Sequence, residues 1–193
     1  MSLARRLRDA LDAPAEQQPL AGDLPENLNG PAIAAAVLIA VTERDEPGVI
    51  LTVRRDHMRT HAGQIAFPGG RIDPGEEAIG AALREAQEEM GLDPTAADVI
   101  SRLDDYRTLT GFAVTPVLAV IPPDLALEPH DLEVADWFEA PLGHLLDPAK
   151  QRLEGAVFRG RERHYYVIDW NGLRIWGATA AMLVNLSRRL IWA

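Results

Sequence analysis

The chain has 193 residues, of which 47% are hydrophobic and 25% charged, a composition typical of one globular domain with a full core. Its formal net charge of -10 argues against bulk attraction to nucleic acid or to an anionic membrane, although a local group of cations could still bind a phosphorylated substrate. The chain contains no cysteine, which excludes disulfides, thiolate zinc sites and cysteine nucleophiles.

A short helix and an irregular arm are predicted at the N-terminus. The stretch "MSLARRLRDALDA" mixes arginines with aspartates and has no apolar signal-peptide core, so we interpret it as a surface helix. Residues 13–31 are rich in Pro, Gly, Gln and Asn, which is typical of irregular structure. No run approaches the roughly 18 apolar residues of a membrane span, and we expect a cytoplasmic location. We therefore divide the chain into an N-terminal helix and arm, residues 1–31, and one domain, residues 32–193.

A candidate hairpin and a strong helix follow the arm. Residues 32–43 form an apolar run of strand length, and the turn signal "RDEPG" separates it from a second strand at residues 49–55. Residues 77–90 are the strongest helix prediction, because apolar residues recur at helical spacing and Gly91 can end the helix.

Further strands and helices alternate downstream. Strands are predicted at residues 99–107, 112–121 and 134–139, a short helix at 142–146, a β-rich stretch at 156–176 and a closing helix at 178–190. Asn171 and Gly172 form the "NG" signal of a hairpin turn within the β-rich stretch. This order of elements predicts one mixed α/β domain.

Three glutamates crowd the C-terminal half of the helix predicted at residues 77–90. At 100° per residue, Glu85, Glu88 and Glu89 lie on one arc beside the apolar stripe, with Glu85 and Glu89 nearest the core. The stripe comprises Ile79, Ala82, Leu83, Ala86 and Met90. Like charges at this spacing repel, the negative end of the helix dipole adds to the penalty, and Arg84 supplies only one counterion. A hard divalent cation, which prefers oxygen ligands, would relieve this repulsion; the alternative is a solvated acidic face.

The sequence around these glutamates resembles a known motif. Gly70, Glu76 and the run "REAQEEMGL" that begins at Arg84 resemble the Nudix box at every defining position. The resemblance implies the Nudix fold, an α/β/α sandwich around a mixed β-sheet. It also implies Mg²⁺- or Mn²⁺-dependent hydrolysis of a nucleoside diphosphate linked to another moiety.

The same resemblance implies roles for individual residues. Glu85, Glu88 and Glu89 would be metal ligands, together with a backbone carbonyl of the Gly69–Gly70 loop, where a missing Cβ allows close approach. Arg84 would pair with Glu76 and support the site structurally.

A carboxylate must also orient or deprotonate the attacking water. Glu85 or Glu88 could do this. Glu133, in the stretch "HDLEVADWFEAPL", is a further candidate for the base or for an extra metal ligand. The alternative for Glu133 is a solvated loop glutamate.

The stretch "LTVRRDHMRTHAGQIAFPGG" upstream of the box resembles the additional signature of coenzyme A pyrophosphatases. The matching residues are Leu51, Thr52, Arg54, Met58, His61, Gly63, Gln64, Phe67, Pro68, Gly69 and Gly70. One departure is Arg55, which stands where the subfamily usually has serine. Residues 108–117 and 175–183 also look like this subfamily. The resemblance implies that coenzyme A is split into adenosine 3′,5′-bisphosphate and 4′-phosphopantetheine.

The candidate substrate-binding residues are Arg54, Arg59, His61 and Gln64. Arg54, Arg59 and His61 belong to the basic stretch of an acidic chain, which also contains Arg55 and His57 and suits a coenzyme A-like substrate with several phosphates; surface loop charges are the alternative. Other functions stay open: hydrolysis of ADP-ribose, a dinucleotide or a nucleoside triphosphate, or nucleotide binding without catalysis. We therefore expect a small nucleotide as partner, with no nucleic acid and no membrane, and a homodimer is compatible with the sequence.

Overall fold

The computed structural model of the chain describes residues 1–15, 17–23, 30–55, 63–158 and 160–190. The helices are α1 (Leu3–Asp12), α2 (Ala78–Met90), α3 (Leu142–Leu146) and α4 (Ala178–Arg189), with short 3-10 helices η2 (Pro94–Ala96) and η3 (Pro148–Lys150). The strands are β1 (Ile33–Thr42), β2 (Gly48–Arg54), β3 (Ile65–Ala66), β4 (Gly69–Arg71), β5 (Asp98–Arg102), β6 (Tyr106–Arg107), β7 (Phe112–Ile121), β8 (Val134–Pro141), β9 (Arg152–Phe158), β10 (Arg161–Trp170) and β11 (Leu173–Trp176).

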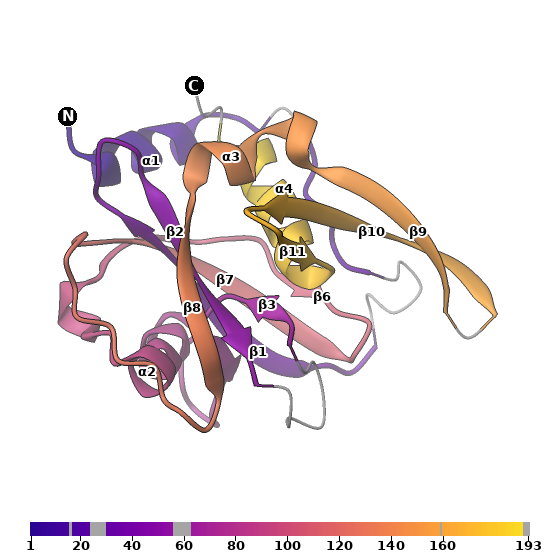
Figure 1. The fold of residues 1–193 in the computed structure, drawn as a ribbon, viewed down its shortest axis with the longest axis horizontal. Helices are drawn as coiled ribbons and strands as arrows, with labels where there is room; N and C mark the ends of the chain where they lie inside the picture. Colours follow the sequence, from indigo (N-terminus) through magenta and orange to yellow (C-terminus); the bar gives the residue numbers. More distant parts are fainter. Residues whose placement is uncertain (16, 24–29, 56–62, 159, 191–193) are drawn as a thin grey trace.

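Within the described residues, eight strands form one mixed sheet (Figure 1). Its main path is β3-β2-β1-β7-β5, and β4 pairs with β1, β6 with β7 and β8 with β2. Strands β1 and β7 run parallel from the pair Ile33 and Phe112 to the pair Thr42 and Ile121, whereas the other pairs are antiparallel. The hairpin predicted between β1 and β2 is confirmed by the antiparallel pairing of Val41 with Val49. Strands β9, β10 and β11 form a separate antiparallel sheet.

Helices cover both faces of the mixed sheet. Alternate residues of a strand point to opposite faces, and in β1 both sets are buried, which explains its continuous apolar run. Ala36, Leu38 and Ala40 pack with α2, whereas Ala35, Ile39 and Val41 belong to the core that contains α1, α3 and α4. In Figure 1, α2 accordingly lies on one side of the central strands, and α1 and α4 lie on the other. The predicted α/β/α sandwich around a mixed sheet is confirmed.

The predicted elements differ from the structure in two instructive places. The single strand expected at residues 99–107 is two strands, β5 and β6, because Asp104 and Asp105 interrupt it, and Asp105 instead accepts a hydrogen bond from the Thr115 hydroxyl at 2.7 Å. Ile79, expected on the buried stripe of α2, is 39% exposed, whereas Ala78 and Ala81 are buried. Small alanine side chains bring the helix close to the sheet, so its buried face is rotated towards Glu85 and Glu89.

The remaining predicted elements agree closely. Helices α3 and α4 and strand β7 lie where the sequence places them. The Asn171–Gly172 turn joins β10 to β11, and both residues have positive φ, 49° and 77°, as a tight hairpin turn requires. None of the helices in the described ranges is long and apolar enough to cross a membrane.

Candidate active site

The C-terminal half of α2 presents its three glutamates in different degrees of burial. Glu89 is 5% exposed and lies in the buried face of the helix, and the Glu85 side chain is also largely covered. The Glu88 side chain is 59% exposed. The prediction that Glu85 and Glu89 lie nearest the core is therefore confirmed.

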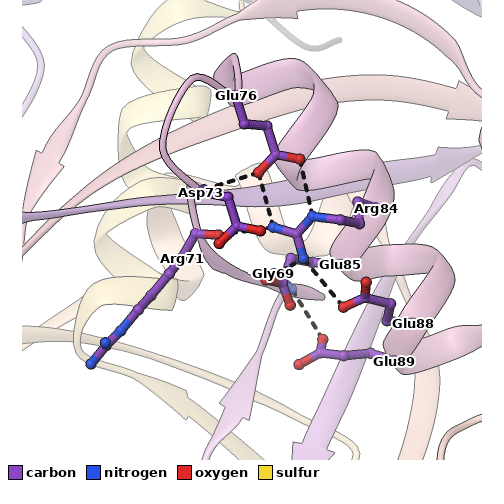
Figure 2. Close-up of polar contacts among 8 residues, drawn as sticks. All are labelled: Gly69, Arg71, Asp73, Glu76, Arg84, Glu85, Glu88 and Glu89. Carbon is purple, nitrogen blue, oxygen red and sulfur yellow. Dashed lines mark hydrogen bonds and ion pairs between the residues drawn. The ribbon is translucent and has the colours of Figure 1, made fainter.

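Glu89 is held by strand β4. The amide of Gly69 donates a hydrogen bond to Oε2 of Glu89 at 3.0 Å (Figure 2). Burial raises the pKa of Glu89 to about 7; the Gly69 amide and the Arg54 guanidinium oppose this shift, and the charges of Glu133 and Glu85 add to it. The charges of Arg54, Glu85 and Glu133 therefore all act on the Glu89 carboxylate, which indicates that these four side chains lie near one another.

Glu85 is positioned by the absence of a side chain at Gly70. A Cβ built on Gly70 would lie 2.4 Å from the carboxyl carbon of Glu85, so a side chain at position 70 would displace this carboxylate from its present place. Burial raises the pKa of Glu85, the Arg84 guanidinium lowers it, and the charges of Glu88 and Glu133 raise it further. The two glycines thus help to position two carboxylates. The Gly69 amide donates a hydrogen bond to Glu89, and the missing side chain at Gly70 leaves space for the Glu85 carboxylate.

Arg84 connects the loop after β4 to the helix (Figure 2). Its Nε and Nη2 donate to the two carboxylate oxygens of Glu76, each at 3.0 Å, so the predicted ion pair is present. Nη2 also donates to the carbonyl of Arg71 at 3.0 Å. The bond from Arg84 is the main cause that lowers the pKa of Glu76, and the Asp73 amide adds to it.

The other end of the same guanidinium contacts the glutamates of the helix. Nη1 of Arg84 donates to Glu85 at 2.9 Å and to Glu88 at 3.2 Å. Arg84 is thus the counterion that the sequence indicates for the cluster, and the spacing of four residues explains its contact with Glu88. Arg84 therefore partly neutralises the cluster as well as bracing the loop.

Glu133 reaches the site through a loop that docks on the end of α2. The amide of Glu128 donates to the carbonyl of Met90, and the amide of His130 donates to that of Glu89, each at 2.8 Å. These bonds satisfy carbonyls that a helix leaves without partners at its C-terminus. The loop then leads to Glu133, which is exposed, immediately before β8. No local sequence signal predicts this docking, which brings Glu133 close enough to influence Glu85 and Glu89.

The end of β2 lies beside the carboxylate cluster and contributes Arg54. Arg54 is half-buried, and its Nε has no hydrogen-bond partner among the described residues. The amide of Arg54 donates to the carbonyl of Gln64 at 3.0 Å, which fixes Gln64 beside it. The amide of Arg55 donates to the carbonyl of Glu133 at 3.3 Å, and its guanidinium lies 3.6 Å from Asp131. Arg55, the departure from the subfamily pattern, thus binds the loop that carries Glu133.

The other predicted substrate-binding residues, Arg59 and His61, lie outside the described residues. Several residues of the same signature serve the core instead. Leu51 and Phe67 are buried, and the buried Thr52 hydroxyl donates to the carbonyl of Ala66 at 3.1 Å. This part of the signature holds β2 against β3.

The donor chemistry of the site suits a hard divalent cation. Its side-chain donors are carboxylates, and two guanidinium groups of the described residues, those of Arg84 and Arg54, act on them. The described part of the chain contains no three His, Cys, Asp or Glu side chains already gathered around one point. Arg84 holds Glu85 and Glu88, and the Gly69 amide holds Glu89, so the carboxylates are near one another and still engaged with protein donors.

Comparison with known proteins agrees with this geometry. A model of the NUDIX domain matches residues 32–159. The chain is 42% identical over 157 residues to the "Uncharacterized Nudix hydrolase NudL" of Cronobacter sakazakii, which covers 81% of this chain and 82% of that protein. The chain is also 40% identical over 157 residues to the protein of the same name in Escherichia coli K12, and the alignment again covers 81% of this chain and 82% of that protein.

A solved structure supports the fold assignment. The Nudix hydrolase RenU of M. Smegmatis superposes with a TM-score of 0.52 and 24% identity over 60% of this chain and 74% of that one, a likeness that concerns the fold alone. Together with the domain match and the close relatives, the carboxylate-bearing helix and the glycine loop that shapes it identify this chain as a member of the Nudix family and a Nudix hydrolase.

Proposed function

We propose that this Nudix hydrolase cleaves the diphosphate bond of coenzyme A or its derivatives, giving adenosine 3′,5′-bisphosphate and 4′-phosphopantetheine. One observation carries the proposal: the segment that resembles the coenzyme A pyrophosphatase signature is continuous with the active site. It begins in β2, which ends at Arg54 near Glu89, and it finishes in β4, where Gly69 and Gly70 contact Glu89 and Glu85.

We assign the metal site to Glu85, Glu88 and Glu89, with the Gly69–Gly70 backbone beside them. When Mg²⁺ or Mn²⁺ is bound, it neutralises charge on the diphosphate oxygens and lowers the pKa of a bound water. Arg84 keeps two of the ligands close together before the ion enters, because it contacts both Glu85 and Glu88.

The remaining steps belong to the side chains of the chain itself. One carboxylate takes the proton of the attacking water, and the candidates are Glu133, Glu85 and Glu88. Glu133 is exposed, and its charge raises the pKa of both Glu85 and Glu89. It is therefore accessible to water and close to the proposed reaction centre. Arg54, whose Nε has no partner among the described residues, is suited to a diphosphate oxygen, and Gln64 beside it is suited to a neighbouring polar group.

The test is a substrate panel in Mg²⁺ with the products resolved by chromatography. Coenzyme A, ADP-ribose, a diadenosine polyphosphate and a nucleoside triphosphate are compared by kcat/KM, with the Glu88→Gln variant as the blank for contaminating hydrolases. We expect coenzyme A to be the best substrate, with cleavage at the diphosphate. Faster turnover of ADP-ribose would refute the substrate assignment, and binding without turnover of any of them would refute catalysis.

A further inference from the structure

A second concave feature lies outside the carboxylate cluster, where β1 and β7 begin. It is a cavity of about 250 Å³ between residues 30–32 and residues 107–112. Hydrogen bonds tie its two walls together: Arg107 Nη1 donates to the carbonyl of Gly30 at 2.7 Å, and the amide of Ile33 donates to the carbonyl of Gly111 at 2.9 Å. The cavity therefore lies at the ends of two central strands of the sheet, and hydrogen bonds join its two walls.

The surface around this cavity is apolar and cationic at once. Phe112 lines it, and Ile33, the parallel partner of Phe112, is 42% exposed, while Leu109 is 40% exposed. The guanidinium carbon of Arg71 lies 5.9 Å from the centre of the Phe112 ring, and Arg107 forms part of the lining. An aromatic ring beside two guanidinium groups suits a planar base that carries phosphate.

Strand β4 links the cavity to the active site. Neighbouring strand residues point to opposite faces, and here Gly70 faces Glu85 whereas Arg71 reaches over Phe112. Figure 2 shows the Arg71 side chain directed away from the glutamates. Gly70 pairs with Ala36, which is three residues from Ile33, so the two places are on the order of 10 Å apart along β1. One nucleoside can cover that distance.

We propose that this cavity binds the nucleoside end of the substrate. The base packs against Phe112 and Leu109, and the phosphate on its ribose lies between Arg71 and Arg107. The identity of that phosphate as the 3′-phosphate of coenzyme A rests on the proposed function. The pantetheine arm carries no charge to pair with these guanidinium groups, so in this proposal it leaves the active site in another direction.

The experiment measures binding of the two halves of the substrate separately by calorimetry. Adenosine 3′,5′-bisphosphate and 4′-phosphopantetheine are titrated into the wild-type protein and the Phe112→Leu and Arg71→Gln variants. Arg5→Gln, an exposed arginine of α1, is the matched control. We expect the Kd of the bisphosphate to rise about tenfold in both cavity variants and the Kd of phosphopantetheine to change less than twofold. The KM for coenzyme A should rise by a similar factor in both cavity variants and stay at the wild-type value in Arg5→Gln.

Two results would overturn the proposal: unchanged bisphosphate binding in both variants, or equal weakening of both halves. Phe112 also packs against the core, so melting temperatures accompany every titration, and Arg71→Gln, at an exposed position, decides if Phe112→Leu unfolds. Titration of AMP separates this proposal from the substrate assignment. If coenzyme A is not a substrate and AMP binding still weakens in Phe112→Leu, the base site stands; if AMP binding is unaffected, the base site is wrong whatever the substrate.

Discussion

The carboxyl group of Glu89 lies in surroundings that favour its protonated form. It is almost fully buried, it accepts a hydrogen bond from the Gly69 amide, and Glu85 and Glu133 repel its charge. These effects raise its pKa to about 7 in the protein without metal, against 4.5 for the free group. A carboxylate so placed costs folding free energy, which a bound cation can offset.

The first prediction concerns pH in the presence of a chelator. Because the folded protein keeps the Glu89 proton up to about pH 7 and the unfolded chain loses it near 4.5, the Glu89 contribution to stability is lost as pH rises through this window. We expect a fall of roughly 1–3 kcal/mol in the free energy of unfolding. Urea unfolding of wild type and Glu89→Gln, at several pH values, measures the difference. Parallel pH profiles for the two proteins would contradict the prediction.

The second prediction concerns two of the proposed metal ligands. Glu88→Gln and Glu89→Gln keep the volume of the side chain and remove its charge. We expect each to lower kcat by at least about 100-fold, the usual size of a lost electrostatic or general-base contribution, with the fold intact by circular dichroism. Glu77→Gln, at the other end of the same helix, is the control and should keep its activity. A loss of less than tenfold for both ligand variants would remove them from the metal site.

Gly70 allows the third prediction, because its contact with Glu85 is steric. In Gly70→Ala the new methyl group overlaps the Glu85 carboxylate, so that side chain must move. We expect activity to fall at least about tenfold because the carboxylate is displaced, and the free energy of unfolding to change by less than about 1 kcal/mol because the end of a flexible side chain can move. Gly143→Ala in α3 is the matched control, since a Cβ there meets nothing within 4 Å. If Gly70→Ala and Gly143→Ala have equal kcat and equal melting temperatures, the new methyl group at position 70 does not displace the Glu85 carboxylate.

At the scale of elements, three segments converge on the C-terminal half of α2. Strand β4 contributes Gly69 and Gly70, the loop after it is held by the Arg84–Glu76 pair, and the segment before β8 docks on the last carbonyls of the helix. Each segment is held by a different kind of contact. The glutamates are therefore positioned by the fold and not by their helix alone.

The fourth prediction tests whether Arg84 holds the loop after β4 against helix α2. Arg84→Ala removes the ion pair with Glu76 and the shared contact with Glu85 and Glu88, so the free energy of unfolding should fall by roughly 1–3 kcal/mol and activity should fall as well. Arg84→Lys keeps the charge without the two-pronged geometry and should recover only part of either loss. Arg102→Ala, in an exposed pair with Asp105, should change stability by less than about 1 kcal/mol. Wild-type stability of Arg84→Ala would exclude a bracing role.

The sequence predicts the elements well and their meeting points less well. Helix α2 and strand β7 follow from periodicity and from end signals such as Gly91, which are local. The contact between residue 130 and the end of α2 joins segments far apart in the chain, so no local pattern reveals it. The burial of Ala78 in place of Ile79 depends on how closely the helix approaches the sheet, and a helical wheel does not contain that distance.

At the scale of the molecule, a formal net charge of -10 must coexist with a polyanionic substrate. Long-range attraction cannot bring a substrate such as the proposed coenzyme A to this surface, so its binding would depend on short-range neutralisation by a cation and a few arginines. Arg54 lies near the carboxylates, and Arg71 and Arg107 lie near the cavity at the start of β7. The cations are thus distributed along the path that we propose for the substrate.

The fifth prediction is that a divalent cation stabilises the whole fold. A ligand that binds only the folded state adds RT ln(1 + [L]/Kd), about 2.7 kcal/mol at a hundredfold excess over Kd, which corresponds to roughly 5–10 °C in the melting temperature of a chain of this size. We expect Mg²⁺ or Mn²⁺ to raise the melting temperature of wild type by this order relative to chelator. The Glu88→Gln and Glu89→Gln variants should respond less, because each lacks one carboxylate of the proposed site. Hydrolysis should stop in chelator and return when Mg²⁺ is restored. Full activity in chelator would exclude an essential metal, and an equal thermal shift in all three proteins would place the cation away from Glu88 and Glu89; in either case burial would raise the pKa of Glu85 and Glu89 with no bound cation to offset it.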